Sequence, residues 1–150
     1  MINVLICGLG AIGSIYAEKF SKSENINLKI LVDEERFEKY KKTPTVFNGK
    51  ELILDYILPN NTDFKADLVV IATKFHNFKN IISDLKNFIN DETVIISLLN
   101  GITSEKLLRQ EYKNVLISYF IGHSSIRNGR EITHDGVNTI IFGSDIKDDK

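Results

Sequence analysis

A glycine-rich turn directly after an apolar run, near the amino terminus, constrains the fold of this chain more than any other feature. Residues 4–7 (Val-Leu-Ile-Cys) lead into Gly8-Leu9-Gly10-Ala11-Ile12-Gly13, and residues 14–20 have the character of a helix. A strand, this Gly-x-Gly-x-x-Gly spacing and a helix together form the fingerprint of a dinucleotide site. Gly8 permits a tight turn, Gly10 permits close approach of a pyrophosphate, and Gly13 permits close packing of helix on strand. We therefore predict a dinucleotide site at Gly8–Gly13; the alternative is a glycine turn that binds nothing.

A second apolar run supports this interpretation because of the acid at its end. Residues 28–32 (Leu-Lys-Ile-Leu-Val) are followed by Asp33, which lies 20 residues after Gly13. A carboxylate at about this offset binds the ribose hydroxyls of a dinucleotide. Asp33 is therefore a candidate ribose ligand, and the alternative is an acid that simply ends a strand.

Length and charge narrow the class of protein. The chain has 150 residues, which favours one domain, and 19 basic against 20 acidic side chains give a net charge of −1. No basic surplus predicts a nucleic-acid partner, and no apolar run approaches the ~20 residues that span a bilayer. The amino terminus lacks the basic segment of a signal peptide, and the one cysteine, Cys7, cannot form an intramolecular disulfide. We expect a cytoplasmic protein.

Strands and helices alternate along the first three quarters of the chain. Apolar runs predict further strands at 68–72, 93–98 and 115–119, and helical patterns cover 34–42, 77–88 and 104–111. Ser104 is the expected N-cap of the last of these helices. Asn48-Gly49, between apolar residues, predicts a hairpin. The pattern predicts an α/β fold with a Rossmann-type, doubly wound parallel sheet.

The pattern changes after Phe120, where helical periodicity ends. Short strands are expected at 122–127, 130–133 and 138–142, joined by hairpin turns at Asn128-Gly129 and Asp135-Gly136. We therefore expect the parallel sheet to finish in a short antiparallel meander. Residues 1–143 then form the dinucleotide-binding domain, and the polar residues 144–150 begin a linker.

Polar clusters follow several of the predicted strands. The carboxyl ends of parallel strands meet at one edge of a sheet, so Asp33–Arg36, Thr73-Lys74 and Asn100-Gly101 should converge on the glycine turn. Lys74 is a candidate for a phosphate, a ribose hydroxyl or a substrate carboxylate, and Asn100 for a carboxamide or a substrate hydroxyl. The alternatives are a solvated lysine at a strand end and an ordinary turn asparagine.

The histidines and serines favour no metal or nucleophile chemistry. His76, His123 and His134 lack metal-ligand spacing, so we expect no zinc site and regard them as structural or surface residues. Ser124 and Ser125 lie next to His123 but without a Gly-x-Ser-x-Gly elbow.

Four segments, in their order and spacing, resemble the amino-terminal half of ketopantoate reductases (2-dehydropantoate 2-reductases). Asp33–Arg36 with Tyr40, and Phe47–Gly49, add to the resemblance, which covers essentially the whole chain. The four segments are Gly8–Gly13, Ala72-Thr73-Lys74, Leu98–Ile102 and Gly122–Gly129.

The resemblance implies a function and places residues within it. The family reduces 2-dehydropantoate to pantoate with NADPH, on the route to pantothenate and coenzyme A. By position, Gly8–Gly13 would bind the pyrophosphate and Lys74 would line the cleft for cofactor and substrate. Asn100 would contact both the nicotinamide end and the substrate, a small 2-keto acid. Ser125 would contact the cofactor through its backbone.

Two departures from the family affect these expectations. Its enzymes are longer, with an all-helical second domain that supplies the general-acid lysine, whereas this sequence ends at Lys150. We expect the chain alone to bind cofactor weakly and to catalyse little, since carbonyl reduction needs a proton donor. Asp33 would repel the 2′-phosphate of NADP(H) and favour NAD(H), but Arg36 can offset this. On family grounds we favour NADP(H), with NAD(H) as the alternative.

A second class of protein has a similar fold. Nucleotide-sensing regulatory modules of potassium transport systems would use the same glycines and an acid after the second strand, without catalysis. The loss of the αβ pattern after Tyr119 and the Asn100-Gly101 loop favour an enzyme over such a module. A remnant without activity is a third possibility.

Overall fold

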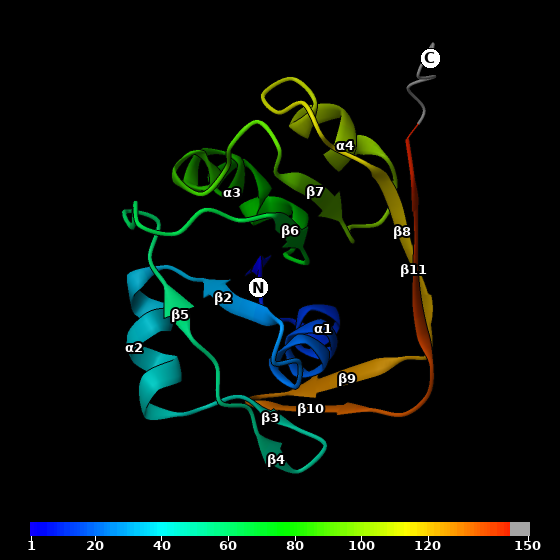
Figure 1. Cartoon of the computed structure of the whole chain (residues 1–150). Coiled ribbons are helices and arrows are strands. Elements are labelled where there is room, and N and C mark those ends of the chain that lie inside the picture. Colours follow the sequence, from blue (N-terminus) through cyan, green and yellow to red (C-terminus); the bar gives the residue numbers. More distant parts are fainter. Residues whose placement is uncertain (145–150) are drawn as a thin grey trace.

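A five-stranded parallel sheet forms the centre of the molecule, with strand order β5-β2-β1-β6-β7 (Figure 1). The computed structural model describes residues 1–144. The glycine turn follows the central strand β1, so it lies in the middle of one sheet edge. The strands are β1 (Ile2–Cys7), β2 (Ile26–Leu31), β5 (Tyr56–Ile57), β6 (Leu68–Ile71) and β7 (Val94–Ser97).

Strand β1 is buried on both faces, which explains its continuous apolar sequence. Leu5 and Cys7 pack into the core on one side of the sheet, and Val4 and Ile6 pack into the core on the other. A parallel strand that helices cover on both sides needs apolar residues at every position. Burial raises the pKa of the Cys7 thiol, and the charge of Asp84 adds to the effect.

Helices lie on both faces of the sheet, which confirms the doubly wound prediction (Figure 1). Helices α1 (Ala11–Ser21) and α2 (Glu34–Lys42) cover one face, while α3 (Phe78–Asp84) and α4 (Thr103–Leu108) cover the other. The 3-10 turns η1 (Phe75–Asn77) and η2 (Leu85–Asn87) flank α3, so the predicted helix at 77–88 is three short pieces. None of the helices in residues 1–144 has the length and apolar character that a membrane crossing needs.

The prediction that Ser104 caps a helix is wrong. Helix α4 begins at Thr103 with Ile102 at its N-cap, and Ser104 lies inside the helix, 2% exposed. The Ser104 hydroxyl donates to Glu105 Oε2 over 2.7 Å and accepts from Ser97 Oγ over 2.9 Å. A tertiary contact with β7 therefore uses the hydroxyl that the local pattern assigned to capping.

A second sheet, with strand order β4-β3-β10-β9, packs beside α1. Its strands are β3 (Val46–Phe47), β4 (Lys50–Glu51), β9 (Ser125–Asn128) and β10 (Glu131–His134). The predicted hairpins at Asn48-Gly49 and Asn128-Gly129 are confirmed, since β3 pairs with β4 and β9 with β10 in antiparallel fashion. Strand β10 also pairs with β3 in parallel, which joins the two hairpins into one sheet.

The predicted antiparallel meander is wrong in its last step. Strand β11 (Asn138–Gly143) pairs with β8 (Ile117–Gly122), not with β10, and these two strands form a separate ribbon. Residues 135–137 therefore carry the chain from the second sheet to the ribbon instead of turning a hairpin. A local Asp-Gly signal marks a change of direction, but it does not specify which strands pair.

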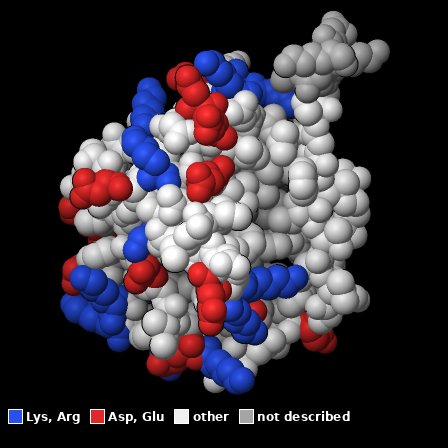
Figure 2. All heavy atoms as spheres, viewed as in Figure 1, with Lys and Arg blue, Asp and Glu red and all other residues white. Residues whose placement is uncertain are grey.

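The strand expected at 115–119 is confirmed only in part, because β8 begins at Ile117 and does not belong to the parallel sheet. Only Val115 forms a parallel bridge, to Ile95, before the chain leaves the main sheet. At Ser118 the side chain, and not the backbone, bonds to β7. Its hydroxyl accepts a hydrogen bond from Ser97 N (3.1 Å) and donates one to Ser97 O (2.7 Å). Figure 2 shows little charge on the side of the molecule where β8 and β11 lie, and Tyr119, Ile121 and Phe142 are exposed there. Of the expected linker, residues 145–150 lie outside the described part of the chain.

Candidate functional site

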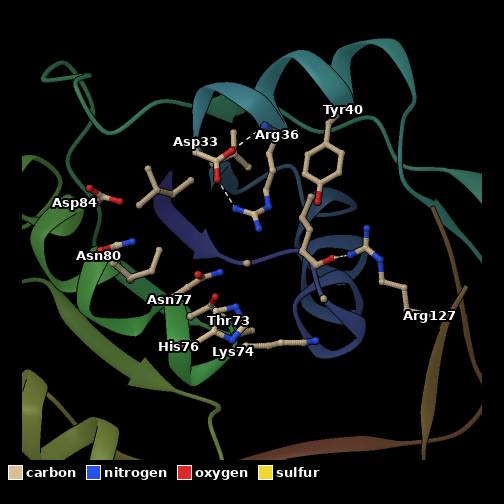
Figure 3. Close-up of a pocket in the computed structure, with 17 residues that line it drawn as sticks. Asp33, Arg36, Tyr40, Thr73, Lys74, His76, Asn77, Asn80, Asp84 and Arg127 are labelled. Carbon is tan, nitrogen blue, oxygen red and sulfur yellow. Dashed lines mark hydrogen bonds and ion pairs between the residues drawn. The ribbon is translucent and has the colours of Figure 1, made fainter. Parts of the chain in front are cut away.

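A cavity of about 360 Å³ opens at the carboxyl ends of β1, β2 and β6 (Figure 3). Four segments that are distant in sequence line it: the glycine turn, the start of α2, the β6–α3 connection and β9. Its position matches the rule that open parallel sheets bind ligands outside the carboxyl ends of their strands. The polar and charged side chains in its wall are Asp33, Arg36, Tyr40, Thr73, Lys74, His76, Asn77, Asn80, Asp84 and Arg127.

Two of the three motif glycines are required by the fold itself. Gly8 has φ = 103°, and a Cβ on it would lie 2.8 Å from the Ala72 carbonyl oxygen. A Cβ on Gly13 would lie 1.9 Å from the Gly8 carbonyl oxygen, so α1 can pack this closely on the turn only with glycine there. The motif thus joins β1, β6 and α1 tightly at the base of the cavity.

Gly10 differs from the other two, because nothing within the protein requires glycine there. Its φ of −74° is ordinary for any residue, and a Cβ would lie 3.8 Å from the Ala72 carbonyl oxygen, a normal contact. Gly10 is also the N-cap of α1, which has no side-chain cap and no acid in its first turn. The N–H groups and positive dipole at this helix start are therefore not satisfied by a capping side chain or by an acid of the first turn.

Asp33 and Arg36 form an ion pair in the cavity wall. Asp33 is the N-cap of α2: its Oδ1 accepts from the Arg36 backbone N over 2.8 Å, and its Oδ2 pairs with Arg36 Nη1. Both side chains are about half exposed. The structure therefore places the acid at the predicted strand end and also gives it a structural role that the sequence pattern did not require.

The β6–α3 connection lines the opposite wall. Lys74 lies three residues after the last residue of β6, close to the predicted strand end, and is exposed. Asn77 is the last residue of η1, Asn80 and Asp84 lie on α3, and Figure 3 shows all three around the cavity. Burial raises the pKa of Asp84, and the nearby charge of Asp33 raises it further. Sequence reasoning missed these three, although polar residues spaced three and four apart on one helix face were a usable signal.

Arg127 was missed as well. It belongs to β9 in the second sheet, yet its guanidinium reaches the glycine turn, where Nη1 donates to the Leu9 carbonyl oxygen (Figure 3). Its Nε donates to the Gly129 carbonyl oxygen over 2.9 Å. No sequence signal connects position 127 to position 9, because β9 reaches the cavity only through its pairing within the second sheet.

Asn100 and Ser125 are not in the cavity wall. Asn100 lies on an exposed loop before Gly101, which has φ = 83°, and Ser125 begins β9. The buried Ser125 hydroxyl has no hydrogen-bond partner within residues 1–144. Ala11, Ile12 and Gly13 stand in the first turn of α1, behind the cavity-lining Gly8, Leu9 and Gly10. The proposed roles of these residues stay predictions.

A buried cluster of serines holds the loop that carries Asn100. Ser97, at the end of β7, contacts Ser104 in α4 and Ser118 in β8, and Leu99 N donates to Ser97 Oγ over 3.4 Å. Glu105, 2% exposed, accepts from the Ser104 hydroxyl. Both ends of loop 98–102 are therefore attached to the protein interior. Within residues 1–144 no three His, Cys, Asp or Glu side chains are grouped as metal ligands.

The fold defines a Rossmann-type α/β domain with a cavity at the carboxyl edge of its parallel sheet. Solved structures agree with this class: D-mandelate dehydrogenase in a ternary structure with NADH and anilino(oxo)acetate aligns with a TM-score of 0.80, at 22% identity, over 93% of this chain and 47% of that one. The 2-dehydropantoate 2-reductase of Geobacter metallireducens aligns with a TM-score of 0.75, at 19% identity, over 95% of this chain and 49% of that one.

The family follows from the sequence match. The profile of the family described as ketopantoate reductase PanE/ApbA matches residues 4–145, and the chain belongs to this family. The uncharacterized oxidoreductase YkpB of Bacillus subtilis (strain 168) is 28% identical over 148 residues, which cover 95% of this chain and 48% of that protein. A 2-dehydropantoate 2-reductase of Streptococcus pyogenes serotype M3 is 29% identical over 71% of this chain and 36% of that protein. The chain thus spans half or less of the length of these curated relatives.

Proposed function

We propose that this chain is the cofactor-binding part of an NADPH-dependent 2-dehydropantoate 2-reductase, an oxidoreductase that reduces a 2-keto acid to pantoate. Family membership supports the oxidoreductase class, and the name of the Streptococcus relative supports this substrate. Since the relatives extend well beyond the matched region, we propose that a helical second domain supplies the general-acid lysine and most substrate contacts. The chain alone would then bind cofactor weakly and would catalyse little. A cytoplasmic location is part of the proposal.

Gly10 is the observation that best supports a dinucleotide in this cavity. The fold tolerates a side chain at this position, but a ligand that approaches the start of α1 does not. A pyrophosphate fits such a position, because the N–H groups and dipole of the helix start favour anions. The matched part of D-mandelate dehydrogenase, in a ternary structure with NADH, has the same fold.

The remaining predicted residues bind the cofactor, the substrate or both. The nicotinamide ring supplies the hydride when the cofactor is bound. Asp33 binds a ribose hydroxyl, Lys74 lines the cleft, and the Ser125 backbone contacts the cofactor. Asn100 contacts both the nicotinamide end and the 2-keto acid, and the buried serine cluster keeps its loop in place.

The choice between NADP(H) and NAD(H) depends on the Asp33–Arg36 pair. Family resemblance favours NADP(H), and Arg36 would then turn onto the 2′-phosphate. One observation favours NAD(H) as the second candidate: Arg36 is already neutralised by Asp33, and the carboxylate would repel a 2′-phosphate. We find no observation that favours a nucleotide-sensing regulatory module.

Calorimetric titration of the chain with NADPH, and separately with NADH, tests this proposal. Tighter binding of NADPH would support the NADP-dependent reductase, and tighter binding of NADH would support the second candidate. The Gly10→Ala variant should fold normally and lose affinity for both. Failure of the wild-type chain to bind either dinucleotide would contradict the proposed cavity.

A further inference from the structure

Arg127 is the only cavity-lining cation within residues 1–144 that reaches the site from outside the main sheet. Arg36 follows β2 and is neutralised by Asp33, and Lys74 follows β6. Arg127 comes from β9 in the second sheet and contacts the glycine turn at the Leu9 carbonyl. No described carboxylate forms an ion pair with it, in contrast to Arg36.

The contacts of Arg127 fix its guanidinium without using all of its donors. A guanidinium has five N–H donors in a rigid plane. Nη1 donates to the Leu9 carbonyl oxygen, and Nε donates over 2.9 Å to the Gly129 carbonyl oxygen in the turn of its own hairpin. Nη2 has no partner within residues 1–144, so the guanidinium is held beside the glycine turn with donors left for an anion.

The hairpin that carries Arg127 is firmly attached to α1. Ile132 of β10 is fully buried and packs with Ile15 of α1 and Phe47 of β3. Asn48 and His134 exchange two hydrogen bonds: Asn48 Nδ2 donates to His134 O (2.8 Å), and His134 N donates to Asn48 Oδ1 (2.9 Å). Because α1 begins at the glycine turn, Arg127 is positioned relative to the helix start before any ligand binds.

We propose that Arg127 binds the pyrophosphate of the dinucleotide, opposite the N-terminus of α1. A planar guanidinium with free N–H groups matches phosphate oxygens, and its hydrogen bonds to them are charge-assisted. The pyrophosphate would then lie between the helix start and the arginine, and the second sheet would form part of the binding site. This inference rests on the proposed function, because it assumes a dinucleotide in the cavity.

Binding measurements on arginine variants test the inference. Wild type, Arg127→Gln and Arg127→Lys are titrated with NADH, NADPH and ADP, which contain a pyrophosphate, and with adenosine and 2′-AMP, which do not. Arg130→Gln is the matched control, since Arg130 lies on the same hairpin, pairs with Glu51 and does not line the cavity. Thermal unfolding of each variant is recorded alongside.

The expected result is selective. Arg127→Gln should weaken NADH, NADPH and ADP by about tenfold or more, and leave adenosine and 2′-AMP within about twofold. Arg127→Lys should recover part of the loss, because the charge remains, and Arg130→Gln should bind every ligand as wild type does.

Other outcomes overturn the inference in distinguishable ways. If the wild-type chain binds no dinucleotide, the proposed function fails and the inference fails with it. If wild type binds and Arg127→Gln binds equally well, only the inference fails. Equal losses for adenosine and ADP would mean that Arg127 supports the turn structurally. A loss confined to NADPH and 2′-AMP would assign the arginine to the 2′-phosphate instead.

Discussion

The glycine turn with its flanking elements, residues 2–21, and the β8–β11 ribbon differ in how deeply their side chains are buried. In β1, residues Leu5, Ile6 and Cys7 have no exposed surface: Ile6 packs in the core that α1 covers, and Leu5 and Cys7 pack in the core that α3 and α4 cover. In the ribbon, Tyr119 is 52% exposed and Phe142 is 63% exposed. Hydrophobic burial therefore dominates the first region, whereas the second is attached by the hydrogen bonds of Ser118 together with the packing of Phe120 and Ile140 on the core.

The cavity contains residues of two kinds: those close together in the sequence and one that only strand pairing brings to the site. The base of the cavity consists of residues from one short, buried stretch of sequence. Arg127 reaches the same cavity from β9, which the structure positions through strand pairing and Ile132. The chain between β9 and the main sheet includes the ribbon strand β8, so a loosely buried region connects two parts of one site.

Gly13→Ala should have the largest effect on stability, since it disrupts the close packing of α1 on the glycine turn. The new Cβ would lie 1.9 Å from the Gly8 carbonyl oxygen, and α1 or the turn would have to move. We expect destabilisation by about 3 kcal/mol or more, measured by urea unfolding. Gly10→Ala is the matched control, and its free energy of unfolding should change by less than about 1 kcal/mol. Equal stability of the two variants would contradict the distinction between these glycines.

Ser118→Ala should have the next largest effect on stability, because it removes the hydrogen bonds that join the ribbon to the main sheet. Both Ser97 backbone groups that bond the Ser118 hydroxyl would lose this partner in the protein interior. An unsatisfied buried polar group costs about 1–3 kcal/mol, and urea unfolding should show a loss of this size.

A substitution on the exposed face of the ribbon provides the control. Ile121→Thr should change stability by less than about 0.5 kcal/mol, because Ile121 is exposed. A larger loss from Ile121→Thr than from Ser118→Ala would mean that apolar packing, and not the serine hydrogen bonds, holds the ribbon.

Asp84→Asn should have the smallest effect on stability, and the size of that effect depends on pH. Burial and the charge of Asp33 raise the pKa of Asp84 in the folded protein, so the folded state binds its proton more tightly than the unfolded state. Ionisation therefore lowers stability as the pH rises above the unfolded pKa of about 3.9, and the penalty stays above the folded pKa.

The variant removes that penalty. We expect Asp84→Asn to be more stable than wild type at about pH 7, by less than about 1 kcal/mol because the side chain is partly exposed, and equally stable at about pH 3. Thermal unfolding at both pH values measures the difference. A variant that is less stable at about pH 7 would show that hydrogen bonding by Asp84 outweighs its desolvation.

Prediction from sequence succeeded where a local sequence pattern is compatible with only one arrangement in the folded protein. The glycine turn, the continuous apolar strands and the acid after β2 all lie where the patterns place them, because parallel strands with helices on both faces leave few other arrangements. Strand β5 was missed because only two residues pair, and Ser104 was misassigned because its hydroxyl bonds Ser97 and Glu105 instead of capping the helix.

The sequence by itself determined the fold class, the glycine turn and the strand ends that carry Asp33 and Lys74. These features depend on periodicity and on residues close together in the chain. Only the tertiary structure decided that β11 pairs with β8, that Asp33 is neutralised by Arg36, and that Arg127 stands at the Leu9 carbonyl. Turn signals indicate where a chain reverses direction. Which strand a given strand pairs with depends on burial and hydrogen bonds throughout the molecule, and a local pattern does not contain this information.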